Sequence, residues 1–210
     1  YRLISILSKV ELKRIFQAKE LTDSDFEKIG KAVELLEKSN FFIDDTSALS
    51  PSEILSRSRK LKREFPELGL VVLDYLQLMR ADNSNPSRVN EMSEISRATK
   101  ALAKELDVPV IALSQLNRAS ETRTNKEPIM ADLRDSGALE QDADLVIFPF
   151  RPEFHEPTPE NKGIAKVIVA KHRNGETGNI LLHWAARYTS FEDLALNDPA
   201  YDNFSSNNQN

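Results

Sequence analysis

The chain has 210 residues, of which 40% are hydrophobic and 29% charged, so it is long and apolar enough for one domain with a real core. The lack of cysteine excludes disulfides and thiolate metal sites, and the histidines do not have the HExxH spacing of a zinc hydrolase. The formal charge of -5 argues against a chain coated with nucleic acid, and the lack of a long apolar run argues against a membrane span. We expect a cytosolic protein whose contacts with DNA or RNA are local.

The first part of the chain is predicted to be helical over residues 9–39. Apolar residues recur there at helical spacing, namely Phe26, Ile29, Val33 and Leu36. Ser24 to Glu27 fits a capping box at the start of the main helix. The aromatic and branched segment 41–45 is predicted to be a strand.

A second helix start is predicted at Ser50, with Pro51 at the first helical position and Glu53 closing another capping box. A later helix is predicted from the apolar face formed by Met92, Ile95, Thr99, Leu102 and Leu106. The predicted strands are residues 68–76, 108–116, 142–150, 163–171 and 179–185.

Strands that alternate with helices and are aliphatic on both faces predict an α/β fold with a parallel sheet covered on both sides. The last two strands flank the turn at residues 172–178 and predict an antiparallel hairpin. We predict one domain over residues 1–196, followed by a disordered tail over residues 197–210, which is rich in asparagine.

A carboxylate and an amide follow two of the predicted strands. Asp74 ends the aliphatic run "VVLD", as in the second nucleotide motif (Walker B) of phosphate-loop ATPases, and Gln115 follows the aliphatic residues 110–113. Because ligands gather at the carboxyl ends of parallel strands, both side chains are expected at one sheet edge. Each also has a plain structural interpretation, Asp74 as a turn or cap residue and Gln115 as a partner for backbone groups.

Charged residues cluster in three further places. Lys171 and Arg173 lie one residue apart in "AKHRNG", on the same side of a strand end, and a turn at that position does not explain the paired cations. The stretch 118–135 balances basic with acidic residues, so by composition it indicates a solvated surface loop. The basic stretch 57–64 is interpreted as a solvated helix face.

Four segments, in this order and spacing, resemble the carboxyl-terminal motor domain of the DnaB-type replicative DNA helicases. They are "VVLDYLQLM", "VNEMSEISRATKALAKELDVPVIALSQLNR", "DLRDSGALEQDADLVIF" and "VAKHRNGETG". The resemblance extends from about residue 1 to about residue 195. It implies a RecA-like fold, with a mostly parallel sheet flanked by helices, and a ring of six subunits around single-stranded DNA with ATP sites shared between neighbours.

The resemblance also implies roles for the four residues of the nucleotide site. Asp74 would be the acid associated with Mg²⁺, and Gln115 would sense the terminal phosphate. Lys171 and Arg173 would be a trans-acting pair, including the arginine finger, that reaches the γ-phosphate bound by the adjacent subunit. A cation delivered there offsets charge that builds up in the transition state.

In the resembling proteins "DLRDSG" is a loop facing the central channel, which makes Arg134, Asp135 and Gly137 the contacts to the DNA backbone. Arginine pairs with phosphate, and glycine lets backbone N–H groups approach closely, so such contacts read no base sequence. The implied cofactors are ATP and Mg²⁺. The implied partners are single-stranded DNA, further copies of the chain in a homohexamer, a primase and a helicase loader, with no membrane, in the bacterial cytoplasm at the replisome on the nucleoid.

One expected motif, the phosphate-binding loop GxxxxGK[ST], does not occur in the sequence. The Gly-Lys pair Gly30–Lys31 has Asp25 at the position where the motif requires its first glycine. The catalytic glutamate of the family is missing too, so we interpret the chain as the distal part of a motor that does not hydrolyse ATP alone. Our leading hypothesis is an ATP-driven hexameric helicase that translocates on single-stranded DNA and unwinds the duplex at the replication fork. The alternatives are a non-catalytic RecA-like module for assembly or DNA binding, and a RecA-type recombination ATPase that forms open filaments.

Overall fold

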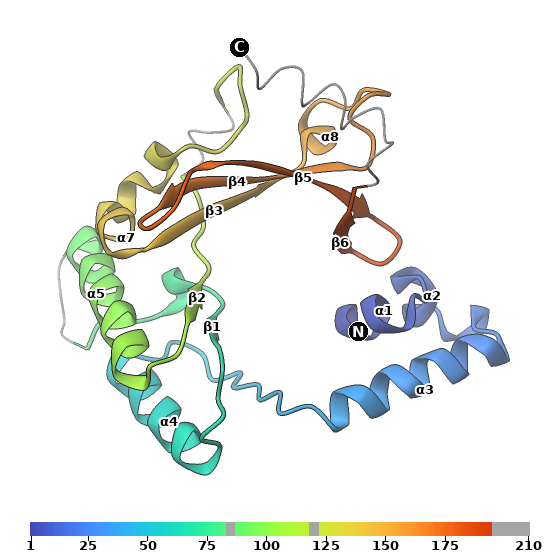
Figure 1. Cartoon of the computed structure of the whole chain (residues 1–210), viewed down its shortest axis with the longest axis horizontal. Helices are drawn as coiled ribbons and strands as arrows, with labels where there is room; N and C mark the ends of the chain where they lie inside the picture. Colours follow the sequence, from blue (N-terminus) through green and yellow to red (C-terminus); the bar gives the residue numbers. More distant parts are fainter. Residues whose placement is uncertain (83–86, 118–121, 195–210) are drawn as a thin grey trace. The chain divides into compact units, whose positions relative to one another are not determined.

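The computed structural model describes residues 1–82, 87–117 and 122–194, apart from the side chains of residues 134–136. The chain divides into two compact units (Figure 1). Unit 1 consists of Tyr1–Asp44, Pro149–Ile168 and the part from Gly178 onward, and unit 2 consists of Asp45–Phe148 and Val169–Thr177. All the candidate site residues belong to unit 2. The predicted tail, residues 197–210, lies outside the described residues.

The amino-terminal part of unit 1 is helical, as predicted for residues 9–39, and a further helix that was not predicted, α1 (Arg2–Ser8), precedes them. The other helices of this part are α2 (Leu12–Phe16), η1 (Ala18–Glu20) and α3 (Asp23–Glu37), and α1 packs against α3. The capping box of α3 is formed by Thr22 and Asp25, so the prediction of Ser24 to Glu27 was two residues late. Asp25 also pairs with Arg14, which a local pattern does not reveal.

Unit 1 also contains the short helix α8 (Pro152–His155) and the strands β5 (Gly178–Ala185) and β6 (Ser190–Asp193). These two strands are antiparallel, with Leu182 opposite Asp193 and Ala185 opposite Ser190. With β3 (Leu145–Phe150) and β4 (Ile164–His172) they form a four-stranded sheet in the order β3-β4-β5-β6. The predicted hairpin of β4 and β5 is confirmed, whereas β6 was not predicted.

The predicted strand at residues 41–45 is wrong, because this segment has no regular secondary structure. A strand needs a neighbouring strand for its backbone hydrogen bonds, and the segment belongs to neither sheet. Its central side chain, Ile43, is 79% exposed, so the apolar pattern of the segment does not reflect burial in this chain.

Unit 2 is built on two parallel strands, β1 (Val71–Leu73) and β2 (Val110–Ala112), with Val71 opposite Val110 and Leu73 opposite Ala112. Helix α4 (Pro51–Glu64) precedes β1, and its predicted capping box at Ser50 and Glu53 is confirmed. The 3-10 helix η2 (Leu76–Leu78) follows β1, and the long helix α5 (Arg88–Leu106) joins it to β2. This succession of strand, helix and parallel strand is typical of α/β folds.

The core of unit 2 lies where α5 packs against its neighbours. Figure 1 shows α5 between α4 and α7 (Gly137–Asp142), and the contacts of α5 include β2 and η2 as well. One buried cluster consists of Leu76, Met79, Met92 and Ile95, and the other of Leu102, Leu106 and Val108. The predicted apolar face of the helix is therefore confirmed, and it anchors the segment that follows β1 and the segment that leads into β2.

The segment before β3 is helical as well. It forms the 3-10 helix η3 (Met130–Ser136), which runs directly into α7. None of the helices within residues 1–82, 87–117 and 122–194 combines the length and the apolar character needed to cross a membrane.

Candidate functional site

Asp74 and Gln115, which we call the strand-end pair, follow the carboxyl ends of two neighbouring parallel strands. The chain leaves β1 and β2 together, because Leu113 donates its N–H to the carbonyl of Leu73 at 2.9 Å and Leu76 donates to the carbonyl of Leu113 at 3.0 Å. The two side chains are thus positioned at one edge of the sheet by backbone hydrogen bonds. This part of the predicted arrangement is present in the structure.

Both members of the strand-end pair are exposed. The Asp74 carboxylate has no hydrogen bond or ion pair with any of the residues that the structure describes, and the same holds for the Gln115 side-chain amide. An ionised carboxylate without a protein partner at the carboxyl end of a parallel strand is open to a ligand or a hydrated cation.

Gln77 fixes the geometry of the strand-end pair, and no sequence pattern predicted this role. Its side-chain Nε2 donates to Ser114 Oγ at 2.9 Å and to the Gln115 carbonyl at 3.3 Å. Its Oε1 accepts the Gln115 N–H at 3.2 Å. One amide thus joins the segment after β1 to the segment after β2, where the only sequence signal was a polar residue inside the apolar run "YLQLM".

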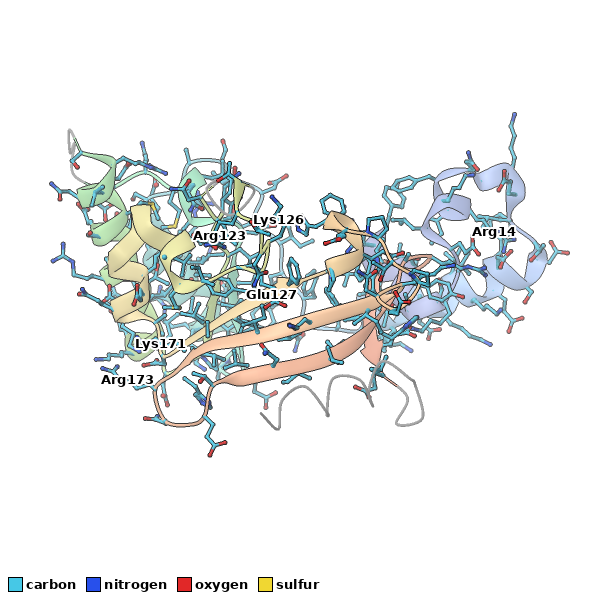
Figure 2. The ribbon with its side chains drawn as sticks, turned by 90° about the horizontal axis from the view of Figure 1, so that it is seen from above. Arg14, Arg123, Lys126, Glu127, Lys171 and Arg173 are labelled. Carbon is cyan, nitrogen blue, oxygen red and sulfur yellow. The ribbon has the colours of Figure 1, made fainter. Side chains whose placement is uncertain are left out.

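Lys171 and Arg173, which we call the cation pair, lie at the end of β4 and the start of the β4–β5 turn (Figure 2). Lys171 Nζ donates to the carbonyls of Glu140 at 2.6 Å and Gln141 at 3.2 Å, close to the carboxyl end of α7. A cation is stabilised there by the carbonyls that a helix end leaves without partners. The helix α7 therefore holds Lys171 in place.

Asp144, the residue before β3, holds the second cation. Arg173 donates its backbone N–H to the Asp144 carbonyl at 2.8 Å and its guanidinium to the Asp144 carboxylate at 3.1 Å. Lys100 of α5 pairs with the same carboxylate. The hydrogen bond from Lys100, followed by that from Arg173, lowers the pKa of Asp144 below its usual value, so the acid is charged at neutral pH.

The two pairs are held by different neighbours within unit 2. No hydrogen bond or ion pair between described residues joins Asp74 or Gln115 to Lys171 or Arg173. Asp74 and Gln115 follow β1 and β2, whereas the two cations contact α7 and the residue before β3. The resemblance assigns the cation pair to the nucleotide of an adjacent subunit, so the contacts within one chain leave that assignment a prediction.

The predicted DNA contacts lie in and after η3. The structure describes the backbone of Arg134 and Asp135 as part of this 3-10 helix, so the predicted loop is helical, while their side chains lie outside the described part. Gly137 begins α7 with a φ of -52°, which any residue adopts. A Cβ built on Gly137 would meet no described atom within 4 Å, so packing inside the chain does not demand glycine there.

Within the described residues, no group of three or more histidine, aspartate or glutamate side chains is arranged to hold a metal ion. Asp74 is thus a single carboxylate rather than part of a preformed protein cage.

Almost the whole chain matches one protein family. Residues 1–193 match the family described as the DnaB-like helicase C terminal domain. The replicative DNA helicase DnaB of Pasteurella multocida is 47% identical over 195 residues, which is 92% of this chain and 42% of that protein. The replicative DNA helicase DnaB of Haemophilus influenzae is 45% identical, again over 92% of this chain and 42% of the relative. The chain therefore spans less than half the length of these relatives.

Solved structures of similar proteins also superpose on this chain. One of them, described as an ATPase domain, superposes with a TM-score of 0.88 at 40% identity, over 92% of this chain and 69% of that one. A DnaB-like replicative helicase, studied for its interactions with primase, also superposes with a TM-score of 0.88 at 40% identity, over 92% of this chain and 47% of that one. These likenesses confirm the predicted RecA-like α/β class.

Proposed function

The chain belongs to the DnaB-like helicase C terminal domain family, and on that basis we propose that the protein carrying it is an ATP-driven replicative DNA helicase. It would translocate on single-stranded DNA and unwind the duplex at the replication fork. The observation that carries the proposal is the strand-end pair, in which a carboxylate and an amide without described partners lie at one edge of a parallel sheet in a chain of this family.

Asp74 fits a role toward a Mg²⁺ ion that arrives with ATP. Mg²⁺ keeps several of its waters and is commonly bound by one or two carboxylates together with substrate phosphates, so a single exposed carboxylate suits it. When bound, the ion neutralises charge on the phosphates. The phosphate-binding sequence GxxxxGK[ST] does not occur in this chain, and we assign the cradling of the phosphates to residues outside it.

Gln115 would report the presence of the terminal phosphate. Its side-chain amide has no described protein partner, while its backbone is bound on both sides by Gln77. An amide held in this way donates to a phosphate oxygen when ATP is bound and changes partner when the phosphate leaves. The segment after Gln115 would then move with the nucleotide state.

The cation pair would act on the nucleotide of a neighbouring copy of the chain. Its support comes from the contacts within one chain, which place Lys171 and Arg173 on α7 and Asp144 rather than on the strand-end pair. A ring in which each copy presents its cations to the next one would complete every site. Arg173 would then stabilise the charge that develops on the γ-phosphate.

DNA would lie against η3 and the start of α7, where Arg134 and Asp135 belong to the 3-10 helix and Gly137 follows it. Because packing within the chain leaves open space around Gly137, close approach of a DNA backbone is a reason for glycine at that position. The further partners that we propose are a primase and a helicase loader, and the proposed location is the replisome on the bacterial nucleoid. A DnaB-like relative has been studied for its interactions with primase.

The test is ATP hydrolysis and unwinding of forked DNA by the complete protein with Mg²⁺. We expect both activities in the wild type, and we expect Asp74→Asn to lower kcat for ATP by about 100-fold, because one preorganised electrostatic group is worth that much. Asp107→Asn is the matched control, since Asp107 is an exposed residue in the left-handed cap of α5, a conformation that asparagine also favours. A complete protein that binds DNA without hydrolysing ATP would instead be a non-catalytic module, and one that forms open filaments without unwinding would be a recombination ATPase.

A further inference from the structure

An ion pair with a buried carboxylate connects the region of Gln115 to the region of Arg134. Asp132 is only 3% exposed, and its carboxylate accepts hydrogen bonds from the Arg123 guanidinium at 2.9 and 2.8 Å and from the Ile129 N–H at 2.9 Å. The two bonds from Arg123 are bidentate, which is the strongest and most directional form of this contact. Figure 2 shows Arg123 close to Lys126 and Glu127.

Asp132 is also bound through its backbone. Its carbonyl accepts the N–H of Asn117 at 2.9 Å, and its own N–H donates to the carbonyl of Ile129 at 2.9 Å. Asn117 closes the sensor loop, by which we mean residues 114–117. Asp132 lies in the DNA-facing turn, by which we mean residues 130–137. Asp132 therefore belongs to the DNA-facing turn and is hydrogen-bonded to the sensor loop.

Arg123 uses its remaining donors on the chain between the two segments. Its guanidinium donates to the carbonyl of Glu127 at 2.9 Å and, through Nε, to the carbonyl of Asn125 at 3.4 Å. The side chain thus folds residues 123–132 around Asp132. Loss of Arg123 would leave the buried Asp132 carboxylate without its charge partner, and loss of the Asp132 charge would free the half-buried Arg123 side chain, so either change releases the turn from its fixed position.

From these contacts we propose that the Arg123–Asp132 ion pair is a positioning element that couples the sensor loop to the DNA-facing turn. The inference rests on the proposed function, because it gives the path by which a phosphate contact at Gln115 alters the hold on DNA. Asn117 follows Gln115 by two residues, and Asp132 precedes Arg134 by two, so the hydrogen bond from Asn117 to Asp132 is the short link between them. Neither Arg123 nor Asp132 is assigned a contact with nucleotide or DNA.

The chain contains a matched ion pair elsewhere. In unit 1, Arg14 binds the carboxylate of Asp25 and donates to the carbonyl of Glu20 at 2.8 Å. The exposed side-chain fractions are 30% for Arg14 and 8% for Asp25, against 31% for Arg123 and 3% for Asp132. The two pairs are therefore similar in chemistry and burial and differ in what they connect, since the unit 1 pair joins helices of the amino-terminal segment.

The experiment measures the coupling between nucleotide and DNA in the complete protein. The Kd for a fluorescent oligothymidine is determined without and with a non-hydrolysable ATP analogue and Mg²⁺. The ratio of the larger Kd to the smaller one measures the coupling and is compared among variants. We expect the ratio to fall about tenfold toward one in Arg123→Ala and in Asp132→Asn, which is the size of a typical coupling between sites. Arg123→Lys keeps the positive charge but cannot form the bidentate contact, so its Kd ratio should lie between the ratios of these two variants and that of the wild type.

Arg14→Ala is the control, and it should lower thermal stability while leaving the ratio unchanged. Asp132→Asn preserves the shape of the side chain, so it supplies the answer if Arg123→Ala fails to fold. A wild-type ratio in folded Asp132→Asn or Arg123→Ala would overturn the positioning role while leaving the helicase proposal intact. A wild type that neither hydrolyses ATP nor binds single-stranded DNA would overturn both.

Discussion

The strand-end pair and the cation pair show two ways in which one unit of this protein presents polar groups. Asp74 and Gln115 have side chains with no described protein partner, and backbone bonds and Gln77 fix only the segments that carry them. Lys171 and Arg173 are each bound through the side chain itself, by the end of α7 and by Asp144. The difference fits the two proposed roles, because a group that receives a ligand must be open, whereas a group delivered to a neighbour must be held in position.

The largest effect on ATP hydrolysis is expected from removing the arginine of the cation pair. Arg173→Ala should lower kcat for ATP in the complete protein by about 1000-fold, the usual value of an arginine that stabilises a transferring phosphoryl group, with little change in the Kd for ATP. Stopped-flow nucleotide binding and steady-state hydrolysis measure the two quantities. Arg187→Ala is the control, because Arg187 is 77% exposed and pairs with Glu11 in unit 1. An equal loss of binding and turnover would mean that Arg173 serves ground-state binding instead.

A smaller effect is expected where the strand-end pair is positioned. Gln77→Ala removes three hydrogen bonds that join the segments after β1 and β2, so kcat should fall by about tenfold to a hundredfold, as is typical when a reacting group is slightly misplaced. Gln77→Glu keeps the acceptor for the Gln115 N–H and should retain more activity than alanine. Steady-state kinetics that show alanine and glutamate to be equally active would contradict the positioning role of this amide.

The smallest effect concerns the acid that holds Arg173. Because its folded-state pKa is lowered, the Asp144 carboxylate stays charged at neutral pH, and its stabilising bonds are present above the usual aspartate pKa and lost as the pH falls through the lowered value. Lys100→Ala should move the pKa of Asp144 back toward its usual value further than Arg173→Ala does, since the hydrogen bond from Lys100 is the larger cause. Carboxyl NMR titration of the two variants gives the order directly, and the reverse order would show that Arg173 is the stronger partner.

Local patterns predicted those elements whose signals lie within a few residues. The start of α4 is set by Ser50 and Glu53, through hydrogen bonds to neighbouring backbone groups, and by Pro51 at the first helical position. The helical spacing of the apolar residues in α5 predicts which of its faces is buried. The strand ends that carry Asp74 and Gln115 followed from aliphatic runs in the same way. Hence the α/β class and the placement of Asp74 and Gln115 at one sheet edge could be predicted from the sequence.

The wrong or missed predictions concern features that depend on contacts with residues far away in the sequence. The capping box of α3 uses Thr22 and Asp25 rather than the equally suitable Ser24 to Glu27, and Asp25 is also bound by Arg14. Residues 41–45 have a strand-like composition but belong to neither sheet in the part of the chain that the structure describes. Gln77 acts through contacts with residues 37 and 38 positions away, which no local spacing reveals.

The central claim is that the cation pair completes the nucleotide site of a neighbouring copy, and mixed assemblies test it most directly. Arg173→Ala subunits keep an intact strand-end pair, whereas Asp74→Asn subunits keep an intact cation pair, so each variant alone should hydrolyse ATP at the low rate predicted for it above. When the two are mixed and allowed to exchange subunits, interfaces that join the intact halves should form, and ATP hydrolysis should return. If exchange is verified and the mixture stays as inactive as its components, the two pairs act within one chain and the shared site is contradicted.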